Sequence, residues 1–434
     1  MGAEYVTKFP RILANVLIVL LSLPILTGCW DRQDPENMAF VIAIGVDPGP
    51  KNNYLFTFAI AVPKLLGAGG QSSDAMNKSI VVHTVEGSNI VSAILASQSF
   101  VARKITLTHA KAFVLGENIA KKGIMPVLSE VVRSQEFRRS FYVMTTHGNA
   151  ETYIKNIKPT TETDISLWFE LELDPKNVGS MLPYNSRFHN FINDMEKPGT
   201  GAVTIETAYR PDISKGKAHL SQGEGESEER QPIIGEQNAG NVRRTGEVPV
   251  EFLGSAVYKA DKLIGFLNGD ETKIYSMLRD EYLRTAWDFQ DPANKELNLT
   301  IDMKAQKRAV MKVKRKKNKI KVNFSIAMEG DLISVQSNTD YTKSKNRKKL
   351  EQSIEKNLKS DSMKLLDKTI HKWQVDCFHI NNQVKSTFST LKEWEDYKWK
   401  KHVKDIDYHV DVKFYMRGHG DQVGPALIGD VLKK

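Results

Sequence analysis

The first half of the chain alternates short apolar runs with amphipathic segments. Apolar, β-rich residues fill 38–46 and 54–62, and the Asp, Pro, Gly and Asn residues between them favour a turn, so this stretch predicts a hairpin. A helix at 88–99 is expected to begin at Ser88 and to bury one face, formed by Ile90, Val91, Ile94 and Leu95. The alternation continues with strands at 79–85, 105–116 and 141–146, and with helices at 125–134, from 149, and within 163–200. Strands that alternate with helices are typical of an α/β layer domain.

The second half follows a different pattern. A hairpin is predicted at 252–268 with its turn at 259–262, and a helix follows at 270–281. Strict alternation of apolar residues at 320–328 predicts a strand with one buried and one solvated face, which is typical of antiparallel sheets. The remaining elements are strands at 297–305, 309–315 and 406–416, and a long helix at 346–373 whose apolar side chains form one stripe.

These patterns predict a fold class of α/β plus α+β: an N-terminal mixed-sheet α/β domain, then an antiparallel-sheet α+β region with a long covering helix. The predicted domains are 29–210 and 248–418, and a division of the second near 290–345 stays open. Residues 211–247 are rich in Gly, Glu and Ser, which predicts a polar linker or mobile loop. Residues 419–434 are expected to form a flexible tail.

The N-terminus has the layout of an export signal. Lys8 and Arg11 precede an uncharged apolar run at 12–27, and small residues follow. A transmembrane anchor is the alternative, but it needs about 20 apolar residues, and this run is shorter and contains Pro24. N-myristoylation is disfavoured because Val6 stands where Ser or Thr is needed. Residues 1–28 are therefore predicted to be a signal peptide.

The signal ends in Leu26-Thr27-Gly28-Cys29, which resembles the lipobox of bacterial lipoproteins at all four positions. The resemblance implies that diacylglycerol is attached to the Cys29 sulfur and that a peptidase cuts before Cys29. One acyl chain binds a bilayer only marginally, whereas two give a lasting attachment. Because Cys377 is the only other cysteine, a lipidated Cys29 leaves no intramolecular disulfide. The body is expected to be tethered to the lipid bilayer through diacylglyceryl-Cys29.

Charge bears on the partners of such a body. The formal charge is +9, and the mature chain keeps +8 because Lys8 and Arg11 outweigh Glu4 in the signal. Export excludes nucleic acid as a partner, whereas an anionic lipid surface attracts a basic body weakly. Two basic clusters stand out at 312–321 and 343–349. The first cluster lies on both sides of a predicted turn, where lysines protect edge strands from pairing with other chains. The second cluster begins a helix. The alternative is that both clusters face the membrane.

No catalytic constellation, metal site or cofactor motif is predicted. Four residues could act as cation ligands because they share one face of a predicted strand: Asp405, Asp407, His409 and Asp411. The same spacing is expected for polar residues on the solvated face of a strand. Cys377 and His379 are too closely spaced for a zinc pair. "GHGDQVG" at 418–424 resembles a phosphate loop, but too little chain follows it for the helix and second strand of a dinucleotide unit, so a flexible tail is favoured. HExxH and GxSxG are absent. These observations favour a protein that is not an enzyme.

The motif "GCWDR" at 28–32 spans the predicted start of the mature chain, and "AIGVD" follows at 43–47. These motifs resemble the Ger(x)C lipoproteins, the C subunits of bacterial spore germinant receptors. The segment 103–138, which includes His109, is similar to a strand–helix segment of the family, and "GSAVYKADKLIGFLNGDET" is similar to its turn motif. The long helix, "EWEDYKW" and "DVKFYMRG" agree with its C-terminal part. The sequence departs from the family at "QDPEN", and it has Phe378-His379 where the family tends to have Phe-Gly.

The resemblance implies a non-enzymatic, lipid-anchored subunit on the outer face of the spore inner membrane. It also implies a complex with two polytopic membrane subunits that responds to nutrients and triggers germination, with this subunit needed for assembly or signalling. Trp30, Asp31 and Arg32 are then expected to hold the body close to the bilayer, because little chain separates the lipid from the first strand. The alternative is a solute-binding lipoprotein of a membrane transporter, which usually has a flexible tether and two similar α/β lobes.

Overall fold

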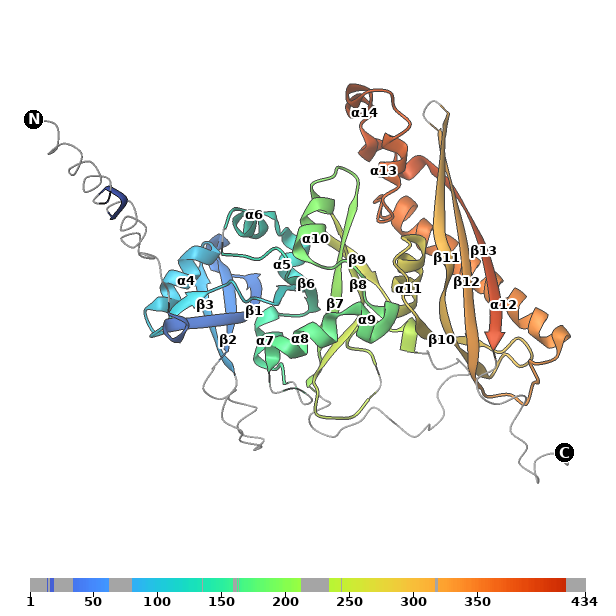
Figure 1. Ribbon diagram of the computed structural model, residues 1–434, viewed down its shortest axis with the longest axis horizontal. Helices are drawn as coiled ribbons and strands as arrows, with labels where there is room; N and C mark the ends of the chain where they lie inside the picture. Colours follow the sequence, from blue (N-terminus) through green and yellow to red (C-terminus); the bar gives the residue numbers. More distant parts are fainter. Residues whose placement is uncertain are drawn as a thin grey trace, which may run out of the picture.

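A computed structural model of the chain places two β-sheets side by side along the long axis of the molecule (Figure 1). It describes residues 34–61, 80–134, 136–158, 162, 164–211, 234–242, 244–316 and 319–418, together with Ala14 and residues 16–18. The predicted tail at 419–434 lies outside this part of the chain.

The first sheet has the strand order β3-β2-β1-β5-β6-β7-β8-β9, and β4 pairs with the start of β1. Strands β1, β5, β6 and β7 are parallel to one another, and the outer pairs are antiparallel. The strands are β1 (Met38–Pro48), β2 (Tyr54–Ala61), β3 (Ile80–Gly87), β4 (Lys104–Thr106), β5 (Ala112–Gly116), β6 (Tyr142–His147), β7 (Gly201–Tyr209), β8 (Val250–Lys259) and β9 (Lys262–Leu267). The predicted hairpins at 38–62 and 252–268 are confirmed.

Helices cover both faces of this sheet. Phe113 and Leu115 of β5 belong to the core beneath α4, α5, α6 and α10, whereas Ala112 and Val114 belong to the core beneath α7 and α8. The helices are α4 (Ile90–Gln98), α5 (Glu117–Lys122), α6 (Met125–Arg133), α7 (Ala150–Lys155), α8 (Ile165–Leu173), α9 (Pro175–Val178) and α10 (Phe188–Met195). A parallel centre buried on both faces is the arrangement of an α/β domain, so the predicted mixed-sheet α/β fold is confirmed.

Helix α4 begins one residue later than predicted, and its buried face differs. The Asn89 side chain accepts the N–H of Ser92 at 2.7 Å, and the Ser92 hydroxyl accepts the N–H of Asn89 at 3.1 Å, so Asn89 rather than Ser88 caps the helix. This register turns Ile90, Ala93 and Ser97 inward. Val91 and Leu95, which were expected to be buried, are 57% and 68% exposed.

The predicted strand 105–116 is interrupted, and the first sheet continues beyond the predicted linker. A turn at 107–111 separates β4 from β5. Strands β7 and β8 pair antiparallel although the predicted linker 211–247 separates them in sequence, and residues 212–233 of that linker lie outside the described residues. The domain boundaries at 210 and 248 stay predictions.

The second sheet has the order β10-β11-β12-β13 and lies at the end of the molecule opposite to β1–β3 (Figure 1). Its strands are β10 (Thr285–Gln290), which was not predicted, β11 (Asn298–Lys316), β12 (Lys319–Val335) and β13 (Ile406–Gly418). The two strands predicted at 297–305 and 309–315 form the single strand β11, whose register shifts between Ala305 and Val310. Strands β11 and β12 are antiparallel, as predicted, and β10 pairs antiparallel with β11.

Strand β13 joins this sheet parallel to β12 because helix α12 (Ser344–Leu366) provides the crossover between them. The helix continues into a π-helical turn, Asp367–Lys372. Its predicted apolar stripe is confirmed, since the side chains that face the sheet are buried: Leu350, Ile354, Leu358, Leu365, Leu366 and Ile370. The α+β region with a long covering helix is therefore confirmed.

Helix α12 also caps the outer edge of β13. Glu355 accepts the N–H of Phe414 at 3.2 Å, and Glu351 accepts the N–H of Met416 at 3.0 Å. Arg347 donates to the Met416 carbonyl. Charged side chains thus occupy backbone groups that an edge strand otherwise leaves open.

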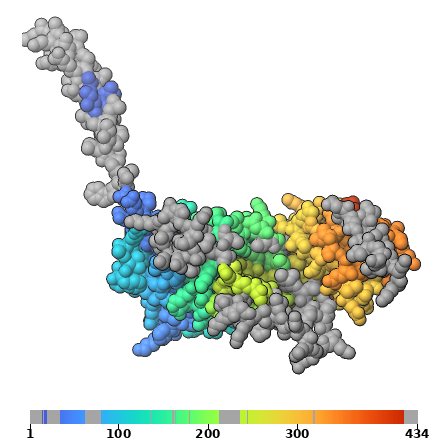
Figure 2. Space-filling view, turned by 90° about the horizontal axis from the view of Figure 1, so that it is seen from below, coloured from blue at the N-terminus to red at the C-terminus, as the bar shows by residue number. Residues whose placement is uncertain are grey.

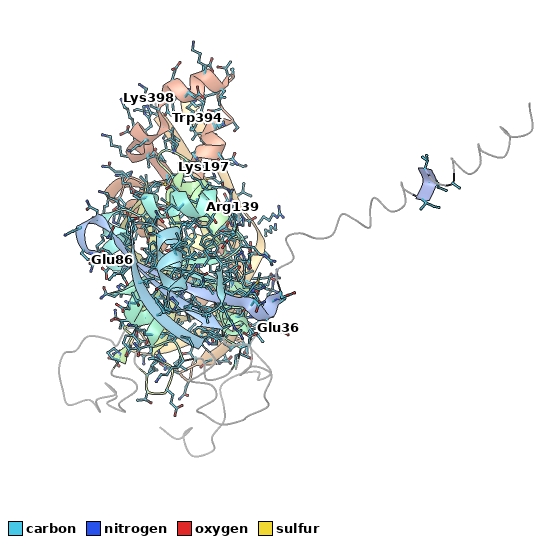
Figure 3. All side chains as sticks on the ribbon, turned by 90° about the vertical axis from the view of Figure 1, so that its left-hand side faces the viewer. Glu36, Glu86, Arg139, Lys197, Trp394 and Lys398 are labelled. Carbon is cyan, nitrogen blue, oxygen red and sulfur yellow. The ribbon has the colours of Figure 1, made fainter. Side chains whose placement is uncertain are left out.

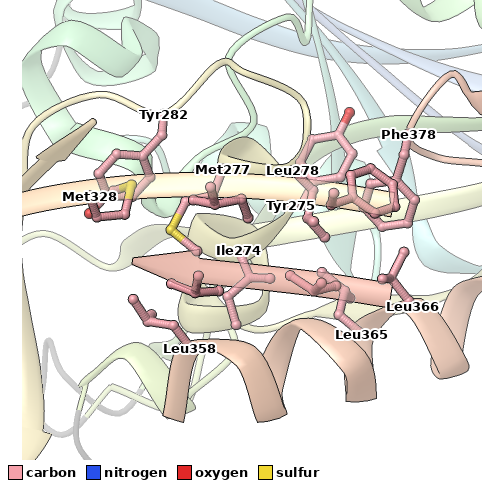
Figure 4. Packing of buried hydrophobic residues seen from close by; sticks show 14 of the residues in the cluster. Ile274, Tyr275, Met277, Leu278, Tyr282, Met328, Leu358, Leu365, Leu366 and Phe378 are labelled. Atoms are coloured by element: carbon pink, nitrogen blue, oxygen red, sulfur yellow. The ribbon is translucent and has the colours of Figure 1, made fainter. Parts of the chain in front are cut away.

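Helix α11 (Gly269–Leu278) joins the two sheets. A capping box formed by Asn268 and Glu271 fixes its start. Figure 4 shows Ile274 and Met277 of α11 between Leu358 of α12 and the strands of the second sheet. The same core cluster contains Val203, Val257 and Leu267 of the first sheet, so one hydrophobic core runs through both.

The loop after α12 crosses back to the start of β7. Asp376 donates its N–H to Gly199 at 2.9 Å and accepts the N–H of Gly201 at 3.0 Å. Gly201 permits this approach, because a Cβ there would lie 2.6 Å from the Cys377 sulfur. The buried Asp376 carboxylate accepts the N–H groups of Phe378, Ile380 and Asn381, which starts α13 (Ile380–Lys385). Helix α14 (Leu391–Tyr397) follows.

We predict that Asp376→Asn lowers the free energy of unfolding by about 2–3 kcal/mol, because one buried N–H loses its acceptor and meets an amide donor instead. Urea titration followed by circular dichroism measures the change. Asp396→Asn on the exposed side of α14 is the matched control and should leave stability within about 0.5 kcal/mol of the wild type. Equal effects of the two substitutions would contradict the role of Asp376.

Candidate functional site

The residues predicted to anchor the protein precede the described part of the body. Both the lipobox residues and the membrane-proximal ones lie outside the described residues, and their roles stay predictions: Leu26, Thr27, Gly28, Cys29, Trp30, Asp31 and Arg32. The described body begins at Asp34 and passes through a short 3-10 turn, Pro35–Asn37, into β1. Among the described residues, no helix is long and apolar enough to cross a membrane.

A polar pocket of about 230 Å³ lies where the two sheets meet. Helix α10 supplies Asn190, Asp194 and nearby Lys197, helix α11 supplies Tyr275 and Arg279, and the loop before α13 supplies His379. These side chains come from three distant parts of the sequence. Apart from His379, which was considered as a metal ligand, none of these residues was predicted from the sequence.

Asp194 is the centre of the charges in this pocket. One oxygen lies 2.8 Å from His379 Nε2 and 3.1 Å from Lys197 Nζ. Burial raises the pKa of the Asp194 carboxyl, but the nearby His379 imidazole and the charges of Arg279 and Lys197 lower it by a larger amount, so the pKa lies below its usual value. The carboxylate is therefore held ionised between the two sheets.

His379 occupies an unusual backbone conformation. Its φ is 58° and its ψ is 34°, the left-handed region in which glycine has no Cβ penalty. The glycine that the family tends to have at this position suits that conformation. The histidine adds an imidazole whose Nε2 lies 2.8 Å from the Asp194 carboxylate. The departure from Phe-Gly is a sequence signal that could have drawn attention to this position.

Arg279 and Cys377 complete the junction. The Arg279 guanidinium donates to Glu281 at 2.8 and 3.2 Å and to the Cys377 carbonyl at 3.2 Å. Burial, followed by the charge of Asp376, raises the pKa of the Cys377 thiol well above its usual value. A buried thiol with a raised pKa is a structural side chain rather than a nucleophile.

A second charged cluster lies at the carboxyl ends of β6 and β7. His147 Nε2 lies 2.7 Å from the buried Glu206 carboxylate, and His147 Nδ1 lies 3.6 Å from Glu117. Burial lowers the pKa of His147, but the two carboxylates outweigh it and raise the pKa overall. Asn238 donates to the other Glu206 oxygen at 2.8 Å, so the cluster ties the segment before β8 to the sheet.

A smaller basic hollow surrounds His109, which lies in one of the family-like motifs. It has a volume of about 100 Å³, and Lys111, Arg138 and Arg187 are among its lining residues. Burial, followed by the charges of Arg138 and Lys111, lowers the pKa of His109. Arg187 stacks over the Tyr142 ring at 4.3 Å and donates to its hydroxyl at 2.9 Å.

The acidic strand face at 405–411 is solvated and paired with lysines. Asp407 lies 3.2 Å from Lys321, and Asp411 lies 3.8 Å from Lys359. No group of three His, Cys, Asp or Glu side chains in the described part of the chain is arranged to hold a metal ion. The loop "GHGDQVG" lies beyond Gly418, outside the described residues.

The two basic clusters lie at opposite ends of β12. Residues 312–321 surround the turn from β11 to β12, whereas residues 343–349 open α12 after the far end of β12. A strand of 17 residues spans about 55 Å. The two clusters therefore form separate surfaces.

We predict that His379→Ala destabilises the protein, because it removes the side chain whose Nε2 lies 2.8 Å from Asp194 and keeps the left-handed backbone. His379→Gly should be more stable than His379→Ala by about 1 kcal/mol, because glycine adopts this conformation without strain. The lowered pKa of Asp194 stabilises the fold above the usual value of 3.8, and this contribution is lost as pH falls through the lowered value. Both variants lack the imidazole that helps to lower the pKa of Asp194. In urea titrations at a series of pH values, the acid loss of stability should therefore begin at a higher pH in both variants than in the wild type. Equal stability of the two variants would argue against backbone strain at 379.

Two family models match the chain in order. The spore germination protein N-terminal domain matches residues 31–207, and the spore germination B3/GerAC-like C-terminal model matches residues 253–420. Spore germination protein B3 of Bacillus subtilis (strain 168) is 23% identical over 408 residues, which cover 93% of this chain and 97% of the relative. Spore germination protein KC of the same organism is 32% identical over 146 residues, 33% of this chain and 36% of the relative.

The crystal structure of the GerBC protein aligns with a TM-score of 0.48 and 17% identity, over 86% of this chain and 96% of that chain. The two models together extend from Asp31, directly after the predicted lipid attachment site and Trp30, to the end of the second sheet. The chain therefore belongs to the Ger(x)C family, the C subunits of spore germinant receptors.

Proposed function

We propose that this chain is the lipid-anchored C subunit of a spore nutrient germinant receptor, needed for receptor assembly or signalling in germination. The observation that carries the proposal is that the family match follows the predicted lipid attachment site almost without a gap. The family match begins at residue 31, two residues after Cys29, and the lipobox-like Leu26-Thr27-Gly28-Cys29 directly precedes it. Membrane attachment and family identity thus come from adjoining residues.

The anchor is diacylglyceryl-Cys29. Two acyl chains give the lasting attachment that one chain does not. Four residues separate Cys29 from Asp34, the first described residue of the body. Five extended Cα steps reach at most about 18 Å, so Trp30, Asp31 and Arg32 hold the first sheet close to the bilayer.

The role is non-enzymatic and needs no cofactor. The chemistry of the described side chains supports a mechanical part, because charged groups at the sheet junction lie within ion-pair distance of one another. Asp194 pairs with His379 and Lys197, Arg279 pairs with Glu281, and the Cys377 thiol is buried. Such a body is suited to hold partners in a fixed arrangement.

The partners are two polytopic membrane subunits, and the site of assembly is the outer face of the spore inner membrane. Membership of a germinant-receptor family supports membrane partners in general. The two sheets are expected to move as one rigid body, because one hydrophobic core runs through both of them. A force or displacement at one end is then felt at the other.

We predict that Cys29→Ala leaves the protein unprocessed or released from the membrane, with the fold intact and germination impaired. Metabolic labelling with fatty acid, membrane fractionation and germination assays measure these effects. Cys377→Ala is the matched control, because it removes the other cysteine and should retain the lipid label. Normal membrane retention of a signal-cleaved Cys29→Ala protein would contradict the lipid anchor.

We also predict that affinity-tagged full chain, extracted with detergent from spore membranes, co-purifies with two multi-pass membrane proteins. A flexible Gly/Ser insertion after Gln33 keeps the anchor but lets the body lie farther from the bilayer. This variant should recover less of the membrane partners and should germinate less well. Recovery of the chain alone, with tight calorimetric binding of a nutrient by the isolated protein, would instead favour a solute-binding lipoprotein.

A further inference from the structure

One end of the second sheet forms a compact basic surface, here named the basic tip: residues 312–316, 319–321 and 385–407. Arg315 binds the two parts together, because it donates to the Thr387 hydroxyl at 2.9 Å and carbonyl at 3.2 Å and stacks over Phe388 at 4.0 Å. Ile320 and Ile406 are partners where β12 and β13 begin. Figure 3 shows Trp394 and Lys398 of the tip projecting beyond the rest of the body.

The basic tip carries a large local excess of positive charge. Residues 312–316 and 319–321 contain six Lys and Arg and no acidic residue, and residues 385–407 contain six Lys against five Asp and Glu. The excess of seven compares with a formal charge of +9 for the whole chain. Together with the separate cluster at 343–349, the tip is one of two strongly basic regions in the second half of the chain.

These lysines are not neutralised within the protein. Lys321 pairs with Asp407 at 3.2 Å. No ion pair joins Lys312, Lys314, Lys316 or Lys319 to a carboxylate among the described residues, and all four are exposed. Like charges so close together repel one another in solution, so a surface of opposite charge stabilises this arrangement.

Aromatic side chains form the base of the tip. Phe388, Trp394 and Tyr397 pack against one another at centroid distances of 5.1–6.3 Å, and each is half-buried. Leu391 at the start of α14 is 59% exposed. Lysines around half-exposed Trp and Tyr are the composition found where proteins meet the lipid headgroup region.

We propose that the basic tip docks on an anionic phospholipid bilayer and forms a second membrane contact besides the lipid anchor. This inference rests on the proposed anchoring through Cys29. Each basic residue close to an anionic surface raises the affinity by about fivefold, so four unpaired lysines suffice for a contact that the anchor has already brought close. Salt weakens such a contact, because it screens exposed charges.

The positions of the two contacts set the orientation of the body. The strand that follows the anchor, β1, lies at one end of the long axis, and the tip lies toward the other (Figure 1). The space-filling view shows the same elongated body, with the N-terminal strands and the second sheet at opposite ends (Figure 2). Contact at both ends lays the long axis along the bilayer instead of upright on its tether.

The test uses the full-length lipidated protein in vesicles of phosphatidylcholine, with or without phosphatidylglycerol. A polarity-sensitive fluorophore is attached at Leu391→Cys or, as a matched control, at Ile333→Cys near the other end of β12. The two sites are 59% and 53% exposed, and Cys377 is buried and stays unlabelled. Lipids with nitroxide headgroups quench a probe that touches the bilayer.

We expect quenching at position 391 in anionic vesicles only, reversed by salt, and none at position 333. Replacing Lys312, Lys314, Lys316 and Lys319 together by Gln should abolish the quenching. The same replacement of Lys343, Lys345, Lys348 and Lys349, which are equally exposed at the other end of β12, should leave it unchanged.

The outcomes separate the tip from the anchor. Protein that floats with neutral vesicles but shows no quenching at 391 in anionic ones, or loses it equally in both lysine variants, overturns docking of the tip and leaves the anchor standing. Failure to float with neutral vesicles overturns the anchor. In that case docking of the tip still predicts salt-sensitive binding of the protein to anionic vesicles. If this binding is also absent, both the anchor and the docking of the tip are overturned.

Discussion

The structure depends on the burial of helix α11 between two sheets. A helix that is buried on nearly every side cannot be stable alone, so α11 folds only with the elements that surround it. Its start is fixed by the Asn268–Glu271 capping box, and Glu271 also pairs with Lys368 of the π-helical turn at 2.7 Å. Ser255 of β8 bonds Thr272 of α11 at 2.9 Å. Two sheets that could have been separate domains thereby share one core.

Local features of this fold could be predicted from the sequence, but pairings between distant segments could not. The hairpins at 38–62 and 252–268 have turn residues between apolar runs, and both are present. Nothing local shows that β8 pairs with β7 across 211–247, because that choice depends on the burial of both faces of the sheet. Strand β10 was missed because six residues, TAWDFQ, give a weak period, and their pairing with β11 decides their conformation.

The sites show the same division. A lipobox is a contiguous motif, so the sequence alone could predict Cys29 as the lipid attachment site, and this role stays a prediction. The pocket at the sheet junction was not, because Asp194, Arg279 and His379 are far apart in the chain and are brought together only by α10, α11 and the loop before α13. The helix α4 register was misjudged for a related reason. Asn89 and Ser88 are both good caps, and the reciprocal bonds with Ser92 select Asn89.

The capped edge of β13 has a consequence for association between copies of this protein. A thirteen-residue strand at the edge of a sheet is a template for a strand from another molecule. Glu351, Glu355 and Arg347 already occupy the backbone groups of Phe414 and Met416. A second chain could extend the sheet there only by displacing three charged side chains of α12. Wherever copies of the protein are concentrated, as the proposed lipid anchor would make them on a membrane, this arrangement discourages fibre-like growth through the end of β13.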